Sequence, residues 1–245
     1  MQAVILAAGE GKRFGELTAR TNKCLIEIDG KSLIERHIEN IISTDCFSEI
    51  VIVVGYRADQ VIAKVEGKHY GIKISFCYQN MERKGIICSI ESAAEMIHED
   101  FLLLLGDEFI ADNYYEEAAR RFLTGKACCM VGICEEKNPD EIKKNYTFRF
   151  ENGVMKDFVE KPDKVFNSFI GTGNIFFRTE VMQLLKKVDV NPDRNERELV
   201  GLLNLLVRES KDIVEFTVGR AYVNVNDENA YKRAADISRN IRCPE

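Results

Sequence analysis

Short apolar runs alternate with segments of helical periodicity along the first half of the chain. The runs at 4–6, 50–54 and 101–105 have the length of buried strands, and each is followed by small residues or glycine. Between them, as at 33–42, apolar residues recur three or four positions apart, which is the spacing of one helix face. The pattern predicts strands at 4–6, 50–54, 72–77, 101–105 and 127–133, and helices at 33–42, 59–65, 87–97 and 114–123.

The pattern changes after residue 134. Two strand-like runs, 146–150 and 154–159, flank Asn152-Gly153, a dipeptide typical of hairpin turns. Further elements follow without a linker or repeat: strands at 171–177, 213–218 and 222–225, and helices at 181–188, 196–208 and 228–241. Alternating strands and helices favour right-handed βαβ units. We therefore expect a single α/β domain over 1–245, with one mixed, mostly parallel sheet flanked by helices and two halves, 1–134 and 135–245.

Composition and charge narrow the class of protein. The chain has 245 residues, of which 45% are hydrophobic, and this is ample for a core. The net charge of −6 argues against a nucleic-acid surface, and no apolar run reaches the length of a membrane span. The eight cysteines lack C-x-x-C pairs and zinc spacing. We expect buried free thiols and a cytoplasmic location.

The first strand opens into a glycine loop that carries candidate phosphate-binding groups. Gly9 and Gly11 let backbone N–H groups approach an anion closely, and Lys12, Arg13 and Lys23 add positive charge. The spacing fits neither the P-loop nor the dinucleotide fingerprint. The alternative is an ordinary glycine-rich turn between a strand and a helix.

A second candidate site follows the strand at 101–105. Asp107 and Glu108 come directly after Gly106, where the end of a buried strand would hold them at the edge of the sheet. A hard divalent cation bound to a triphosphate prefers carboxylate oxygen, so Asp107 is the first candidate ligand for Mg²⁺. Glu108 is the weaker candidate, with a solvated side chain as its alternative. Both acids could instead only cap the following segment.

The N-terminal run resembles the start of the sugar-phosphate and choline-phosphate nucleotidyltransferases. Their pattern is L-A-A-G-x-G-x-R followed by P-K, and here the residue before Lys23 is Asn22 in place of proline. The resemblance implies a Rossmann-like fold of the GT-A type and Mg²⁺-dependent transfer from an NTP to a phosphorylated acceptor. It also implies nucleotide contacts from Leu6, Ala7, Ala8, Gly9, Gly11 and Lys12, and catalytic roles for Arg13 and Lys23.

The same resemblance implies an acceptor-binding half at 135–245. Glu160-Lys161-Pro162 matches the family's E-K-P, in which the lysine meets the acceptor phosphate. Gly173 and Asn174 match a strand that lines the acceptor pocket. An ordinary turn at each of the two places is the alternative.

The second metal ligand of the family is an acidic residue before the closing helix. Asn224 stands at the matching position, and asparagine offers a neutral oxygen. Asn226 or Asp227 could substitute for it. The alternative for Asp227 is that it does no more than cap the final helix.

The nucleotide base is expected to meet Asn80, Gly85 and Ser89. This segment is similar to the N-x-x-S-L pattern of choline-phosphate cytidylyltransferases and favours CTP. We therefore expect a nucleotidyltransferase of the EC 2.7.7 type, most simply a cytidylyltransferase. Its acceptor would be phosphocholine, a phosphonate or a sugar 1-phosphate.

Other functions stay open. One alternative is a sugar-1-phosphate uridylyl- or thymidylyltransferase, and another is a catalytically silent nucleotide-binding domain with a regulatory role. A glycosyltransferase of similar fold would need D-x-D, which the sequence from Asp107 to Phe109 lacks. No oligomeric state is predicted.

Overall fold

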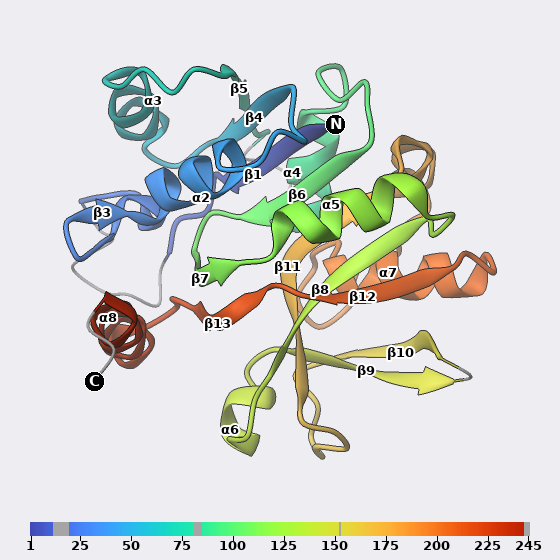
Figure 1. Cartoon of the computed structure of the whole chain (residues 1–245). Helices are drawn as coiled ribbons and strands as arrows, with labels where there is room; N and C mark the ends of the chain where they lie inside the picture. Colours follow the sequence, from blue (N-terminus) through green and yellow to red (C-terminus); the bar gives the residue numbers. More distant parts are fainter. Residues whose placement is uncertain (12–19, 81–84, 152, 243–245) are drawn as a thin grey trace.

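The sheet is built around the first strand. The computed structural model describes residues 1–11, 20–80, 85–151 and 153–242, and its elements are drawn in Figure 1. Strand β1 (Gln2–Ala7) lies between β4 (Glu49–Val54) and β6 (Phe101–Leu105), parallel to both, and β5 (Lys73–Tyr78) continues the parallel order at the edge. The carboxyl ends of all four strands therefore reach one edge of the sheet.

The second half of the chain extends the same sheet with antiparallel pairs. Strand β11 (Phe169–Phe177) pairs antiparallel with β6, with β8 (Cys129–Glu135) and with β9 (Tyr146–Glu151). The hairpin partner β10 (Val154–Glu160) lies at one end of the order β10-β9-β11-β6-β1-β4-β5, and β12 (Ile213–Thr217) pairs parallel with β8. The prediction of a mixed, mostly parallel sheet flanked by helices is confirmed.

Helices cover both faces of the sheet and bury a core on each (Figure 1). Successive side chains of β1 point to opposite faces, so Val4 packs into one core and Ile5 into the other. One core contains α2 (Leu33–Ile42), α3 (Ala58–Glu66) and α5 (Tyr115–Thr124); the other contains α4 (Ile86–Ser92), α7 (Leu199–Arg208) and the 3₁₀ helix η3 (Thr179–Lys187).

A separate two-stranded sheet brings distant segments together beside the main sheet. Strand β7 (Glu108–Asn113) pairs antiparallel with β13 (Gly219–Asn224), and α8 (Glu228–Arg242) packs against this pair. The sequence did not predict β7, because the polar residues after Leu105 read as the end of a strand and not as the link to another. Shorter elements are η2 (Lys23–Leu25), β2 (Glu27–Ile28), β3 (Lys31–Ser32) and α6 (Pro139–Ile142).

Three predicted helices differ from the observed ones. Helix α4 ends at Ser92 and not at 97; the Ser92 hydroxyl donates to the Cys88 carbonyl at 2.9 Å, a contact that competes with helix continuation. The predicted helix at 181–188 is the 3₁₀ helix η3. Helix α7 begins later than predicted, because Glu196 pairs with Asn191 in an isolated β-bridge. Asn152 of the predicted hairpin turn lies outside the described residues.

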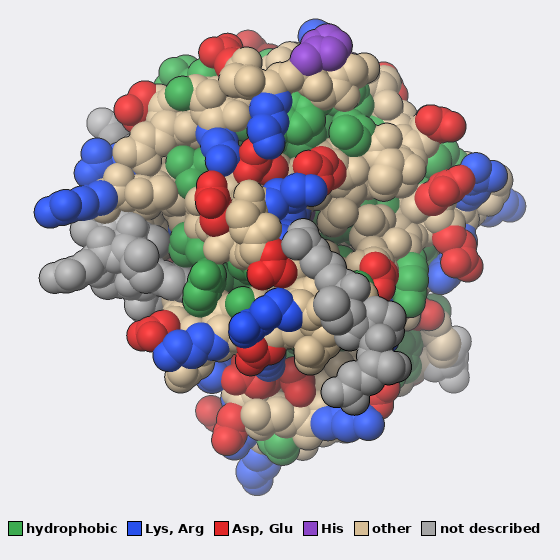
Figure 2. Space-filling view, turned by 60° about the vertical axis from the view of Figure 1, so that its left-hand side comes forward, with side chains coloured by type: hydrophobic (Ala, Val, Ile, Leu, Met, Phe, Trp, Pro, Cys, Tyr) green, Lys and Arg blue, Asp and Glu red, His purple; other side chains and the backbone are tan. Residues whose placement is uncertain are grey.

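The described part of the chain bears on the expectations for cysteines, membrane spans and surface charge. Its cysteines are all free thiols, and it contains no helix of the length and apolarity needed to cross a membrane. On the face drawn in Figure 2, basic and acidic side chains are interspersed among the described residues.

The buried histidine of α2 generates a testable pH dependence. His37 is 1% exposed, and burial lowers its pKa from 6.5 to about 4. The unfolded chain therefore takes up a proton between pH 6.5 and about 4 that the folded protein does not, so stability is lost as the pH falls through this window. Between about pH 7 and 4.5, wild type should lose more unfolding free energy than His37→Gln does, by roughly 2 kcal/mol.

Urea unfolding at several pH values measures this difference. The exposed His69 provides the matched control, and His69→Gln should keep the pH dependence of wild type. An identical pH dependence in His37→Gln and wild type would contradict the assignment.

Candidate active site

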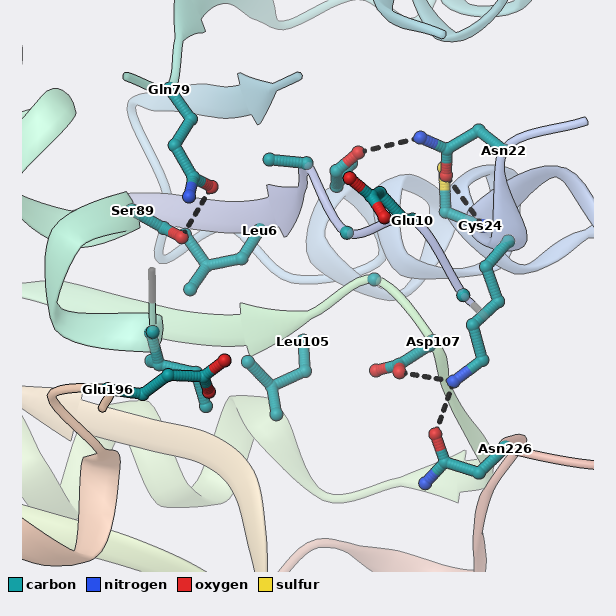
Figure 3. A pocket seen from close by; sticks show the side chains of 18 residues that line it. Leu6, Glu10, Asn22, Cys24, Gln79, Ser89, Leu105, Asp107, Glu196 and Asn226 are labelled. Atoms are coloured by element: carbon teal, nitrogen blue, oxygen red, sulfur yellow. Dashed lines mark hydrogen bonds and ion pairs between the residues drawn. The ribbon is translucent and has the colours of Figure 1, made fainter. Parts of the chain in front are cut away.

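A cavity of about 460 Å³ opens at the carboxyl ends of β1 and β6 (Figure 3). Its wall is formed by the glycine loop after β1, by the turn after β6, by the start of α4 and by the segment after β13. These segments come from both halves of the sequence. The lining residues are Leu6, Ala7, Ala8, Gly9, Glu10, Gly11, Asn22, Lys23, Cys24, Gln79, Gly85, Ile86, Ser89, Leu105, Gly106, Asp107, Glu196 and Asn226.

The glycine loop leaves room for a ligand. A Cβ on Gly9 would meet no atom of the described protein within 4 Å, so the space beside this backbone is open. The carbonyl of Ala8 accepts from Tyr56 N at 3.1 Å, which fixes the loop against the end of β4. The loop therefore has the form of a cradle for an anion. Lys12 and Arg13, predicted to add charge here, lie outside the described residues.

Asn22 takes over the task expected of a proline. Its side chain is buried, and its amide nitrogen donates to the carbonyls of Ala7 at 2.9 Å and Tyr56 at 2.6 Å. Its amide oxygen accepts from Cys24 N at 3.0 Å, which makes an Asx turn around Lys23. Where the family has P-K, three hydrogen bonds of the Asn22 side chain therefore hold the backbone on either side of Lys23.

The side chains of Lys23, Asp107 and Asn226 converge in the cavity (Figure 3). Lys23 Nζ lies 2.5 Å from Asp107 Oδ2 and also donates to Asn226 Oδ1. The lysine side chain is 9% exposed and that of Asp107 is 31% exposed. One carboxylate and one amide oxygen thus contact the same ammonium group.

Close packing at Gly106 places Asp107 beside the glycine loop. Gly106 N donates to the Leu6 carbonyl at 2.9 Å, and a Cβ on Gly106 would lie 2.8 Å from that same oxygen. A larger residue would force β6 away from β1 at this point. Asp107 in turn accepts Val225 N at its carbonyl at 3.0 Å, which joins it to the segment that carries Asn226.

The residues that were candidates for the second metal ligand are placed differently. Asn224 points toward Asn145, with Nδ2 at 3.4 Å from its Oδ1, and does not line the cavity. Asp227 Oδ1 accepts Ala230 N at 2.8 Å and caps α8, as the sequence allowed. Asn226 is the amide beside Asp107. Asn226 lies only two residues after Asn224, and the family motif alone does not distinguish between the two positions.

The donor set at this point fits a hard divalent cation. Asp107 and Asn226 supply oxygen ligands, and the Lys23 ammonium occupies the position of a cation between them. Within the described residues, no cluster of three or more His, Cys, Asp or Glu side chains could hold a metal. Mg²⁺ commonly takes one or two protein ligands together with substrate phosphates, so the small donor set suits it.

The opposite end of the cavity carries the polar side chains of Ser89 and Gln79 and the acidic side chain of Glu196 (Figure 3). The Ser89 hydroxyl donates to Gln79 Oε1 at 2.7 Å, and both residues line the cavity with Gly85. Asn80, predicted to meet the base, is exposed and does not line the cavity. Gln79 belongs to the segment predicted to face the base but was not singled out, although it is the first polar residue after β5. Glu196 was also missed, because nothing local shows that its loop reaches this cavity.

The predicted acceptor residues divide between surface and core. Lys161 is exposed at the end of β10, and its backbone N donates to the Asn145 carbonyl at 2.9 Å. Glu160 pairs with Arg194 at 3.4 Å. Neither Glu160 nor Lys161 lines the described cavity, so their contact with an acceptor stays a prediction.

Glu108, Gly173 and Asn174 lie behind the cavity in a buried hydrogen-bond network. Glu108 accepts from Gly173 N at 2.8 Å, from Asn174 Nδ2 at 2.6 Å and from Tyr222 Oη at 2.6 Å. Asn174 also accepts from Tyr115 Oη at 2.5 Å. The alternative of a solvated Glu108 is wrong, because the side chain sits between β7, β11 and β13. Asn174 is fully buried, and this packing does not favour its predicted contact with an acceptor.

Burial dominates the ionisation of Glu108. It raises the pKa of this carboxyl from 4.5 to about 8, against hydrogen bonds that favour the charged form. Burial likewise raises the pKa of the Cys24 thiol far above its usual range, with a contribution from the charge of Asp107. Cys24 therefore lines the cavity as a neutral thiol.

The chain matches the family model described as nucleotidyl transferase over residues 2–231. It belongs to that family. It is 28% identical over 215 residues to UTP–glucose-1-phosphate uridylyltransferase AglF of Haloferax volcanii, covering 87% of this chain and 86% of the relative. It is 30% identical over 214 residues to glucose-1-phosphate thymidylyltransferase of Streptomyces griseus, covering 87% of this chain and 59% of the relative.

Solved structures support the fold of this nucleotidyltransferase. UDP-glucose pyrophosphorylase complexed with UDP-glucose superposes with a TM-score of 0.82 at 20% identity, covering 98% of this chain and 99% of the other. The prediction of family membership and of a Rossmann-like fold is confirmed. The similarity to choline-phosphate cytidylyltransferases is limited to the short motif, and the expectation of CTP finds no support among these relatives.

Gly85 offers a test of the packing at the end of the cavity that Ser89 and Gln79 line. Its φ is +100°, and a Cβ would lie 2.4 Å from the Arg197 carbonyl oxygen, where the loop before α7 meets α4. Gly71 has φ +74° with nothing within 4 Å of a Cβ, so it controls for a positive φ without the overlap, whereas Gly85 at ψ 158° lies in a region essentially restricted to glycine. Gly71→Ala should lose about 1 kcal/mol of unfolding free energy, and Gly85→Ala a further 1–3 kcal/mol or so.

Chemical denaturation of the two variants measures this difference. Gly85→Ala should also bind nucleotide more weakly in calorimetry, because the start of α4 must shift. Equal stabilities for the two variants would contradict the close packing.

Proposed function

We propose that this chain is a Mg²⁺-dependent sugar-1-phosphate nucleotidyltransferase that uses UTP or dTTP and releases pyrophosphate. The observation that carries the proposal is the convergence of Lys23, Asp107 and Asn226 beside the glycine loop in one cavity. The names of the relatives, which specify glucose 1-phosphate with UTP or a thymidylyl group, support the choice of substrates.

The proposed reaction needs no base from the protein. An oxygen of the acceptor's phosphate attacks the α-phosphorus of the NTP in line and forms a new P–O bond. The bond from the α-phosphorus to the oxygen bridging the β-phosphorus breaks, and its electron pair leaves with pyrophosphate. Because the attacking oxygen is already anionic, catalysis consists of positioning and of neutralising charge.

The residues divide this work between them. The backbone from Gly9 to Gly11 would cradle phosphate oxygens, and Lys23 would neutralise charge on the α-phosphate. Asp107 and Asn226 would hold Mg²⁺, which supplies charge stabilisation to the phosphates when bound. Lys12 and Arg13 are proposed from the sequence for the β- and γ-phosphates, and Lys161 for the acceptor phosphate.

A panel of nucleotides and acceptors tests the function. Pyrophosphate release should be fastest with UTP or dTTP and a sugar 1-phosphate, with kcat/KM at least tenfold above that for CTP and phosphocholine, a difference of about 1.4 kcal/mol. Asp107→Asn should remove the Mg²⁺-dependent rate and serves as the control for contaminating enzymes. Preference for CTP and phosphocholine would restore the cytidylyl hypothesis, and no turnover with any pair would favour a silent nucleotide-binding domain.

A second prediction separates the two asparagines. Asn226→Ala should raise the Mg²⁺ concentration for half-maximal activity by roughly 10–100-fold, the loss typical of a removed metal-site partner. Asn224→Ala is the matched control and should stay within about threefold of wild type, because Asn224 faces Asn145. A Mg²⁺ titration of the rate measures both, and the reverse order would return the metal to Asn224.

A further inference from the structure

We propose that Lys23 is a built-in cation that covers the metal ligands until nucleotide binds, and so couples the binding of metal and nucleotide. The inference rests on the proposed function and extends it. Its basis is that Lys23 Nζ lies 2.5 Å from Asp107 Oδ2 and donates to Asn226 Oδ1, the two oxygens assigned to the divalent cation.

The three side chains come from three segments of the chain, and backbone contacts hold each segment in place. Asp107 follows β6 at the tight Gly106 contact, and Asn226 follows β13. The backbone of Lys23 is fixed by the buried Asn22. The four-carbon stem of Lys23 is the flexible part, so the ammonium can leave the two oxygens by side-chain rotation alone.

An ammonium ion and a divalent cation compete for this place. Both are cations that the same two oxygens attract, and both cannot lie between Asp107 and Asn226 at once. Entry of a metal therefore requires Lys23 to give up its contacts. The ammonium is almost wholly buried, so it needs a new anionic partner when it leaves.

A triphosphate in the same cavity would provide that partner. The glycine loop and Lys23 line one cavity, so phosphate oxygens held by the loop would lie within reach of the ammonium. Nucleotide then favours the arrangement in which the metal ligands are uncovered. By linkage, a bound metal favours nucleotide to the same extent. Without nucleotide, the metal must displace Lys23 at its own cost.

Binding of Mn²⁺ without nucleotide tests the inference. The free ion is followed by electron paramagnetic resonance for wild type and three variants. Lys23→Met should bind Mn²⁺ at least tenfold more tightly than wild type, because the ammonium that lies between the two oxygens is removed. Lys23→Arg keeps a cation at the site and should bind no more tightly than wild type. Lys144→Met is the charge control, since Lys144 pairs with Glu141 at 2.6 Å and acts on Asp227 only through its charge.

The charge control should change Mn²⁺ affinity by less than about twofold, as expected for a screened charge at a distance. The proposal is overturned if Lys23→Met binds no more tightly than Lys144→Met, or if Lys23→Arg gains as much as Lys23→Met. Lys23→Gln replaces Lys23→Met if the latter does not fold by circular dichroism, with the same expected gain. The substrate panel on wild type distinguishes the two proposals. Absence of turnover in the panel would contradict the proposed function, whereas an unchanged Mn²⁺ affinity in Lys23→Met would contradict only the proposed role of Lys23.

Discussion

The arrangement of the cavity depends on how closely β6 approaches β1 at Gly106. The hydrogen bond from Gly106 to the Leu6 carbonyl leaves no space for a side chain, so the turn after β6 lies against the glycine loop. Asp107 is then fixed at the cavity, and β7 follows in a position where it can pair with β13. Through that pairing a segment near the C-terminus reaches a loop near the N-terminus. Lys23 then contacts one oxygen from the turn after β6 and one from the segment after β13.

A buried carboxyl group strengthens the same junction from behind. Glu108 joins β7 to β11 and β13 through hydrogen bonds to Gly173, Asn174 and Tyr222. Burying an ionisable group costs free energy unless its hydrogen-bonding capacity is met, and three donors meet it here. The network links the separate sheet of β7 and β13 to β11 of the main sheet. It thereby joins segments from the two halves of the chain.

Local patterns in the sequence predicted most of the fold. Apolar runs and helical periodicity identified β1, β4, β5, β6 and β8 and the helices between them, because these elements are long and their burial is regular. β7 was not predicted because its strand conformation depends on pairing with β13, more than a hundred residues away. The early end of α4 and the late start of α7 depend on a serine side chain and on a β-bridge, neither of which has a periodic signature.

The candidate site divides in the same way. Motifs located the glycine loop and Asp107, which come closely after β1 and β6, and they located Lys23 by its place in the family pattern. Motifs could not choose between Asn224 and Asn226, because side chains alternate along a strand and its end, and a small error in register selects another residue. Asn174 matched a motif, yet its side chain points into the core. Glu196 enters the cavity only because its loop packs on Gly85.

Asn22 shows how the same local geometry can be specified by two different kinds of information. A proline stiffens a turn through its own covalent ring, and does so even in an unfolded chain. Asn22 instead depends on carbonyls of Ala7 and Tyr56, which come into reach only when β1 and β4 have formed. The orientation of the lysine in this chain therefore depends on β1 and β4 being in place. Any fraying at the carboxyl ends of β1 and β4 would release the turn, while a proline would have kept much of its shape.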